Sequence, residues 1–165
     1  MITETEFKSG MRNFAAAVNV MGVMQEETAS GMLATAMCSV CAQPPIVLVC
    51  NNKSASIHDI LRSTENFCIS VLKADQMAIA RKFMESDKAE RFSQCEWETV
   101  STGAPAIQGA LLNFDCVLHS QFEAGTHTTF FGRVVDLRPS TTRQPLLYHN
   151  ADFATMEPVF DSLSA

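Results

Sequence analysis

The stretch 111-LLNFDCVLHSQFEA-124 carries the clearest secondary-structure signal in the chain. Apolar and polar residues alternate along it, and a period of two is typical of a long strand that is buried on one face. The turn 125-GTH-127 follows, and 128-TTFFGRVVDLR-138 returns with the β-branched and aromatic residues that strands favour. These segments predict a long antiparallel hairpin. Its polar face would carry Asn113, Asp115, His119 and Gln121.

Outside this hairpin, apolar segments predict further strands at 18–24, 32–40, 46–50, 67–72 and 146–149. Helical spacing predicts helices at 4–16, 57–63 and 76–84, and Thr3 to Glu6 has the spacing of a capping box. Residues 25–31 predict a polar turn. No linker or repeat divides the chain, so residues 1–165 are expected to form a single domain. Few peripheral helices, with strands joined mostly by hairpins, predict a mainly β protein: an antiparallel barrel with added helices.

The composition predicts a soluble protein with one core. The chain has 165 residues, of which 47% are hydrophobic, and no window of about 18 residues is apolar throughout. The segment 1-MITETEFKSG-10 lacks the basic start and apolar core of a signal peptide, which favours a cytoplasmic location. A net charge of −6 without a basic stripe argues against nucleic acid and anionic membranes as partners. Small anionic ligands remain compatible with this charge, because they need only a few local cations.

Cys38 and Cys41 have the CxxC spacing of a redox dithiol or of half a zinc site. A four-thiolate zinc site needs a second such pair, which the sequence lacks, and the four histidines are scattered. A thioredoxin-like pair opens a helix, whereas here Pro44 and Pro45 follow closely and favour extended backbone. The sequence therefore predicts no metal site and favours small, buried, reduced thiols, with a thiol–disulfide enzyme as an alternative.

The stretch 50-CNNKSASIHDIL-61 predicts a strand, a polar loop and the start of a helix. Free backbone N–H groups at a helix start suit phosphate. Ser54 and Ser56 would add hydroxyl donors there, and Lys53 a positive charge. An ordinary serine N-cap beside a solvated lysine is the alternative. His58 is expected on the surface of this helix.

His127 is a second candidate, because it follows Gly125 in a tight turn and loops carry function more often than strands do. A surface hairpin histidine is the alternative. Tyr148 and His149 could line a site at the end of a strand. Neither GxGxxG nor a P-loop occurs, so a bound nucleotide would be held without a Rossmann unit.

Four segments together resemble the short-chain flavin reductases. They are 34-ATAMCSV-40, Pro44-Pro45 followed by 48-LVCNNKSAS-56, 90-ERFSQCEW-97 and 125-GTH-127, in the family's order and spacing. The resemblance runs from about Phe7 to Phe153. It is greatest to the reductase component of two-component 4-hydroxyphenylacetate 3-monooxygenases, with the flavin reductases of pyrimidine degradation next. It implies the family's FMN-binding split β-barrel, in a homodimer that holds flavin near the subunit interface.

The resemblance also implies roles for particular residues. The flavin ring and ribityl chain would contact Thr35, Ala36, Met37, Cys38 and Ser39. The phosphate would be held by Asn51, Lys53, Ser54 and Ser56. The nucleotide would be covered by Arg91 and Phe92, and the nicotinamide site lined by His127 with Tyr148 as a further candidate. Relatives often have Ser or Thr at the position of Cys41, so the CxxC would be part of the flavin-pocket wall.

The implied activity is hydride transfer from C4 of NADH or NADPH to N5 of FMN or FAD, after which the reduced flavin serves a separate oxygenase. Flavin would then be a substrate rather than a permanent group. Thr35 and Thr126 stand where much of the wider family has Asn and Asp, and Gly22-Val23 replaces Thr-Thr, which leaves the choice between FMN and FAD open. A split-barrel protein that binds flavin without catalysis, as a redox sensor or flavin carrier, is the alternative.

Overall fold

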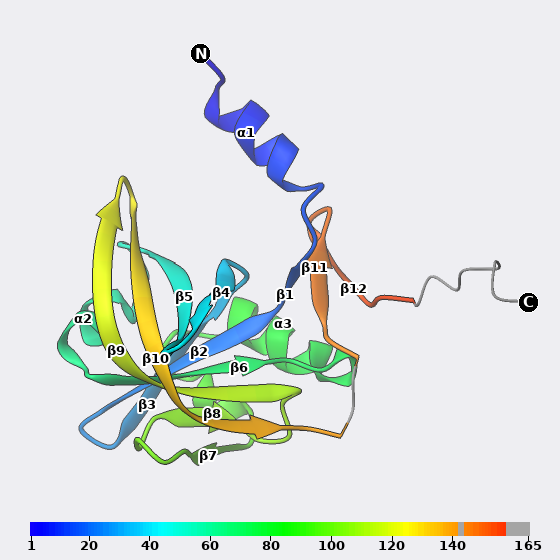
Figure 1. Ribbon diagram of the computed structural model, residues 1–165. Coiled ribbons are helices and arrows are strands. Elements are labelled where there is room, and N and C mark those ends of the chain that lie inside the picture. The colour runs from blue at the N-terminus through cyan, green and yellow to red at the C-terminus, as the bar shows by residue number, and fades with distance from the viewer. Residues whose placement is uncertain (142–143, 158–165) are drawn as a thin grey trace, which may run out of the picture.

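Seven antiparallel strands form the main sheet in the computed structural model, which describes residues 1–141 and 144–157 (Figure 1). The strand order is β3-β2-β6-β9-β10-β5-β4. The strands are β2 (Asn19–Gln25), β3 (Thr28–Ala34), β4 (Met37–Ala42), β5 (Pro45–Asn52), β6 (Asn66–Val71), β9 (Leu112–Ala124) and β10 (His127–Pro139). The prediction of a mainly β, antiparallel protein is confirmed. Among the described residues, however, β3 and β4 do not pair with each other, so the sheet stays open and is not a closed barrel.

Smaller elements surround this sheet. One small sheet contains β1 (Ala16–Ala17), β11 (Leu147–His149) and β12 (Asp152–Ala154), and another contains β7 (Trp97–Thr99) and β8 (Pro105–Ile107). The described helices are α1 (Glu4–Met11), α2 (His58–Ser63) and α3 (Met77–Glu85), with the single turns η1 (Ala74–Gln76) and η2 (Phe92–Gln94). In the part of the chain that is described, no helix is both long and apolar enough to cross a membrane.

Helix α1 begins where predicted but ends early. Thr3 forms the predicted capping box: its Oγ1 accepts the Glu6 N–H (3.2 Å), and its own N–H donates to Glu6 Oε2 (2.8 Å). The helix ends at Met11 rather than at residue 16, because the side-chain amide of Asn13 donates to carbonyls three and four residues before it. None of the helix residues is buried, and Figure 1 shows α1 projecting away from the sheet.

The predicted strand at 32–40 is in fact the end of β3 and the start of β4, interrupted at Thr35-Ala36. The predicted turn at 25–31 is much shorter, since Glu26 and Glu27 both have positive φ and form a two-residue hairpin turn. The strands at the opposite edges of the sheet, β3 and β4, are connected by Thr35 and Ala36 alone. Because so short a connection spans little distance, the sheet must curl until its edges come close at Thr35-Ala36.

Two large apolar cores of the described residues hold the sheet and helices together, and a third, smaller cluster lies beside Cys68. Helix α2 covers a core that includes Met21, Val49, Leu61, Phe67 and Phe130. Helix α3 covers a second core that includes Val20, Leu72, Phe83, Phe92 and Ile107. Each of these side chains is at most 4% exposed. Burial of this kind contributes roughly 1.5–3 kcal/mol for each large apolar side chain, and it fixes the ends of the strands that position the candidate site.

The hairpin β9–β10 forms as predicted, but its burial pattern is different. Asn113 and Asp115, predicted on the polar face, are 4% and 1% exposed, whereas Phe122 is 66% exposed. At the base of the hairpin both faces of β9 are covered, one by the α2 core and the other by β7 and β8. Towards the tip, residues 119–127 are exposed on both faces. Alternation along the sequence therefore does not predict burial here.

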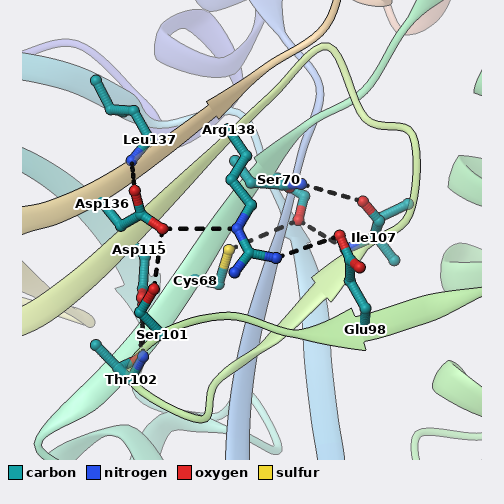
Figure 2. Close-up of polar contacts among 11 residues, drawn as sticks. Cys68, Ser70, Glu98, Ser101, Thr102, Ile107, Asp115, Asp136, Leu137 and Arg138 are labelled. Carbon is teal, nitrogen blue, oxygen red and sulfur yellow. Dashed lines mark hydrogen bonds and ion pairs between the residues drawn. The ribbon is translucent and has the colours of Figure 1, made fainter.

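The buried polar groups of β9 fasten the β7–β8 segment to the sheet (Figure 2). The carboxylate of Asp115 accepts the backbone N–H (2.9 Å) and the hydroxyl (2.5 Å) of Thr102. Nearby, Ser70 Oγ accepts the N–H of Ile107 at 3.0 Å. At the border of this cluster, Arg138 forms ion pairs with Glu98 (3.4 Å) and Asp136 (3.6 Å). Asp115 is therefore a structural residue.

Candidate functional site

The carboxyl end of β5 brings together three segments that were predicted to bind ligands. On one side, Cys50 N–H donates to Ala36 O at 2.9 Å, next to the start of β4. On the other side, His127 is paired with Asn52 in the register of β10 and β5. Beyond the strand, Lys53 N–H donates to Thr126 O at 2.9 Å. Segment 35–39, loop 51–56 and the hairpin turn therefore surround one strand end.

The segment predicted to contact the flavin ring is accessible. Thr35, Ala36, Cys38 and Ser39 are exposed, and Met37 is half-buried. Because β4 is an edge strand, its outer backbone N–H and C=O groups have no neighbouring strand among residues 1–141 and 144–157. Small side chains beside these groups leave them open to the polar edge of a planar ligand.

Three cavities follow β3 from this segment towards the loop after β5. The largest, about 550 Å³, is lined by Thr35, Ala36 and Tyr148 together with residues of α1. A cavity of about 180 Å³ shares Thr35 and Tyr148 with it and adds Leu33 and Met84. A third, of about 230 Å³, shares Leu33 and Met84 and adds Ser56, Lys88 and Arg91. The shared lining residues show that the cavities are adjacent, and their size suits a small-molecule ligand.

The loop before α2 differs from an ordinary capped helix start. Ser54 donates to Asn52 Oδ1 from both its N–H (2.9 Å) and its Oγ (2.8 Å). The N-cap position is Ile57, and no side chain caps the helix. The alternative of a serine N-cap is therefore wrong. Ser56 is exposed and lines the third cavity together with two cations, Lys88 and Arg91.

Lys53 and Asn51 flank this loop in different environments. Lys53 Nζ lies 2.8 Å from Glu123 Oε2, and this hydrogen-bonded pair holds the pKa of Glu123 below its usual value. Asn51 is completely buried, and neither atom of its amide has a hydrogen-bond partner in the described structure. A buried amide without a partner costs about 1–3 kcal/mol, so Asn51 is suited to meet a polar group of a ligand or of ordered water.

Arg91 and Phe92 lie differently with respect to the third cavity. Arg91 lines it and donates from Nη1 to Gly31 O (3.0 Å), while its Nε has no hydrogen-bond partner among the described residues. Partial burial lowers the pKa of Arg91. The Phe92 ring is 4% exposed and packs edge-on against Phe83 and Trp97. It also fills the space where Gly31 lacks a side chain, since a Cβ there would be 2.5 Å from the ring. In this conformation Phe92 anchors Arg91 and is not itself open to a ligand.

His127 and Tyr148 are not brought together. His127 is exposed at the first position of β10, with its Nδ1 at 2.9 Å from Thr126 Oγ1. Tyr148 lines the two cavities beside Thr35, and its ring packs on Phe153. Figure 1 shows the tip of the β9–β10 hairpin and β11 on opposite sides of β4. Within one chain, Tyr148 therefore accompanies the ring-contacting segment rather than His127.

His58 was predicted on the helix surface, and this prediction is wrong. Only 3% of the residue is exposed. Its Nε2 lies 2.9 Å from Thr128 Oγ1, and its Nδ1 lies 3.1 Å from Asp59 Oδ1. The position next to Ile57, at the border of the apolar helix face, is the signal in the sequence that could have indicated burial.

The cysteines differ in exposure, and Cys50 and Cys95 are half-buried. Cys38 and Cys41 were predicted to be buried, but both are exposed because they lie on the edge strand β4; Cys41 Sγ donates to Pro44 O at 3.0 Å. Cys68 and Cys116 are buried; burial raises the pKa of Cys68 to about 12 and also raises that of Cys116. Because only thiolates react readily, these two buried thiols are inert at neutral pH.

The site combines an accessible edge strand, a groove formed by the three adjacent cavities along β3, and a polar loop with nearby cations. These features define a mainly β protein with an open site for a planar, anionic ligand. Residues 11–157 match the model of the flavin reductase like domain, and the chain therefore belongs to this family. The resemblance found in the sequence is confirmed.

Individual relatives agree with this assignment. The chain is 36% identical to the FMN reductase (NADH) RutF of Pseudomonas syringae over 89% of its own length and 83% of that protein. It superimposes with a TM-score of 0.88 and 31% identity on the NADH:FAD oxidoreductase SgcE6 of Streptomyces globisporus, in a complex with NAD and FAD fragments, covering 95% and 94% of the two chains. It also superimposes on BorF, the flavin reductase component of a bacterial two-component tryptophan halogenase, with a TM-score of 0.85, 29% identity and coverage of 95% and 100%.

Proposed function

We propose that the protein is an NAD(P)H:flavin oxidoreductase, which transfers a hydride from C4 of the nicotinamide to N5 of free FMN or FAD. The observation that carries this proposal is the gathering of segment 35–39, loop 51–56 and His127 around the end of β5. The similarity to an FMN reductase that uses NADH supports the same activity. The flavin supplies the redox chemistry, and the protein brings the two rings into contact and excludes other geometries.

Most of the predicted residues keep the roles that the resemblance implies, whereas Phe92 and Tyr148 receive roles that follow from their positions in the structure. Residues 35–39 would receive the ring along the edge strand. The phosphate would be bound by Asn51, Lys53, Ser54 and Ser56, with Arg91 closing the far end of the groove and Phe92 anchoring it. His127 would contact the nicotinamide, and Tyr148 would line the ring end of the groove. This assignment requires no protein nucleophile, since hydride passes directly between the rings.

We further propose that the curled sheet is one half of a split-barrel homodimer in the cytoplasm, and that a separate oxygenase receives the reduced flavin. BorF, with its halogenase, supports a two-component arrangement. The dimer is supported by apolar side chains that one chain leaves exposed. These are Phe7 (56%), Met11 (49%), Phe14 (66%), Val40 (46%), Phe122 (66%), Val135 (46%) and Leu137 (51%). An isolated helix of eight residues is unstable in water, so α1 needs a surface to pack on.

A purified preparation is therefore expected to sediment as a dimer at micromolar concentration. The test variant is Phe7→Ser with Phe14→Ser, which removes two exposed rings and no internal contact of the core. We expect it to shift the equilibrium towards monomer in analytical ultracentrifugation. A wild-type protein that is both monomeric and active under these conditions would contradict the proposed dimer.

The proposed activity is tested by adding NADH and free FMN or FAD to the purified protein and following NADH absorbance. Continuous oxidation that depends on flavin is the expected result. Bound yellow colour without turnover would favour a flavin sensor or carrier instead. Insulin reduction that depends on Cys38 and Cys41 would favour the thiol–disulfide alternative.

Replacing His127 by alanine should raise KM for NADH and lower kcat/KM by about tenfold, while flavin affinity changes by less than about twofold. The reason is that His127 is exposed at the hairpin turn, whereas the phosphate loop is held by other contacts. A tenfold loss corresponds to about 1.4 kcal/mol of barrier. An equal loss of flavin affinity would show that His127 binds flavin or supports the fold.

Cys41→Ser should leave flavin reduction unchanged, because a serine hydroxyl can make the same donation to Pro44 O and no redox role is lost. A fall in kcat of more than about tenfold would contradict this.

The same variant leaves Cys38 as the exposed thiol of the pair. We expect saturating FMN to slow labelling of Cys38 by a thiol reagent, as measured by mass spectrometry, if residues 35–39 line the ring.

A further inference from the structure

Besides the pairing of β5 with β10, three contacts in the described part of the chain join the loop after β5 and the first residue of α2 to the β9–β10 hairpin. Two of them come from Lys53: its backbone N–H donates to the backbone carbonyl of Thr126, and its side-chain ammonium forms an ion pair with Glu123. The third is the contact between His58 Nε2 and Thr128 Oγ1 at 2.9 Å. The two side chains of the Lys53–Glu123 pair are 37% and 56% exposed, whereas His58 and Thr128 are 3% and 1% exposed. The histidine contact is thus the one that water does not reach.

The neighbours of His58 define its hydrogen-bonding roles. The carboxylate of Asp59 accepts and does not donate, so the Nδ1 that faces it carries the proton. In the neutral ring, Nε2 then accepts the hydroxyl proton of Thr128. The ring also packs edge-on against Phe130, with the centroids 5.9 Å apart. Both nitrogen atoms and the ring plane are therefore constrained.

This constrained ring connects the two parts of the proposed site. His58 begins α2, directly after the loop that carries Ser54 and Ser56. Its partner Thr128 follows His127 and is paired with Asn51 in the register of β10 and β5. The contact therefore fixes the position of the phosphate loop relative to the turn proposed to meet the nicotinamide.

We propose that His58 is a positioning residue that sets the distance between the bound flavin and the nicotinamide by joining α2 to Thr128. The proposal rests on the flavin reductase activity proposed above. His58 does not touch either substrate. Its loss should change the hydride transfer rate more than flavin affinity, because small displacements of reacting groups are costly to the rate.

The test compares His58→Leu, Thr128→Val and the double variant with wild-type enzyme. Each single variant leaves one buried polar group without a partner and should lose stability, whereas the double variant replaces both partners and should regain it. We expect all three to show about tenfold lower kcat/KM for NADH, with a flavin Kd within about twofold of the wild type. His58→Gln, whose amide can reach Thr128, should recover most of the rate. His119→Gln, at an exposed histidine of β9, is the matched control and should behave as wild type.

The outcomes separate the positioning role from a purely structural one. Recovery of both thermal stability and kcat/KM in the double variant would overturn the proposal, because the contact would then serve folding alone. A parallel loss of flavin affinity would also overturn it. If the wild-type enzyme reduced neither FMN nor FAD, the proposed activity would be wrong, and the positioning role would be wrong with it. If the wild type were active and the double variant kept its full kcat/KM, only the role of His58 would be wrong.

Discussion

Replacement of Ser54 and Ser56 together by alanine is expected to weaken FMN binding by about a hundredfold or more, while kcat at saturating flavin stays nearly unchanged. Neither hydroxyl caps α2, so neither is needed to hold the helix. Ser54 Oγ donates to Asn52 Oδ1 in the ligand-free protein and would turn its proton to the phosphate when FMN binds, while Ser56 lines the cavity that Lys88 and Arg91 also line. A hydrogen bond to a charged group contributes about 1.5–3 kcal/mol, and the loss of two such bonds gives the expected change in affinity.

Fluorescence titration with FMN and with riboflavin measures this effect and identifies its origin. Riboflavin has no phosphate, so the double variant should bind it as wild type does. Ser63→Ala is the matched control, because its hydroxyl is exposed and donates to Ile60 O within α2. Equal losses for FMN and riboflavin would show that the two serines shape the loop rather than bind phosphate.

Local sequence patterns correctly predicted the elements that show a clear hydrophobic period or contain a known capping motif. The β9–β10 hairpin, helices α2 and α3, and the capping box at Thr3 formed as expected. The end of α1 was missed because the side chain of Asn13, which follows the helix, competes for its last carbonyls. Strands β7, β8 and β12 have three residues each, which is too short for a period to be recognised.

Burial depended on which elements cover each face of the sheet, and the sequence of one strand does not contain that information. His58 was misplaced because Thr128, its buried partner, is 70 residues away in the chain. Phe92 was expected to cover a nucleotide, but Gly31 opens a space that its ring fills. The burial of both side chains arises from contacts between distant segments.

The candidate site was accessible to sequence reasoning mainly through family resemblance. Spacing alone indicated an anion site at loop 51–56 and a turn histidine at His127. It did not indicate that β5 would bring both next to Ala36, since this follows from strand pairing with β4 and β10. The unpartnered amide of Asn51 also becomes visible only when burial and hydrogen bonds are known.

The second large effect is expected at Asp115, where alanine should lower the free energy of unfolding by about 2–4 kcal/mol. The substitution leaves the N–H and hydroxyl of Thr102 without their acceptor, and each lost bond to a buried charge is worth about 1.5–3 kcal/mol. Solvation of the exposed turn returns part of this loss. Urea unfolding with an unchanged m-value would measure it.

Two further variants show whether the burial of the carboxylate is the cause. Asp115→Asn keeps one acceptor oxygen and should lose less stability than alanine. Asp136→Ala, in the same cluster, removes a carboxylate that accepts from Ser101 Oγ at 3.0 Å, but that side chain is 38% exposed, so water can replace the bond and the loss should be small. If Asp115→Ala and Asp136→Ala were equally mild, the β7–β8 segment would be held by the apolar cluster in which its Val100, Ala104 and Ala106 pack with Cys68 of β6. The burial of the Asp115 carboxylate, in a strand whose sequence alternates as in a surface hairpin, would then need another explanation. One such explanation is an effect of this carboxylate on the ligand-binding end of the same hairpin.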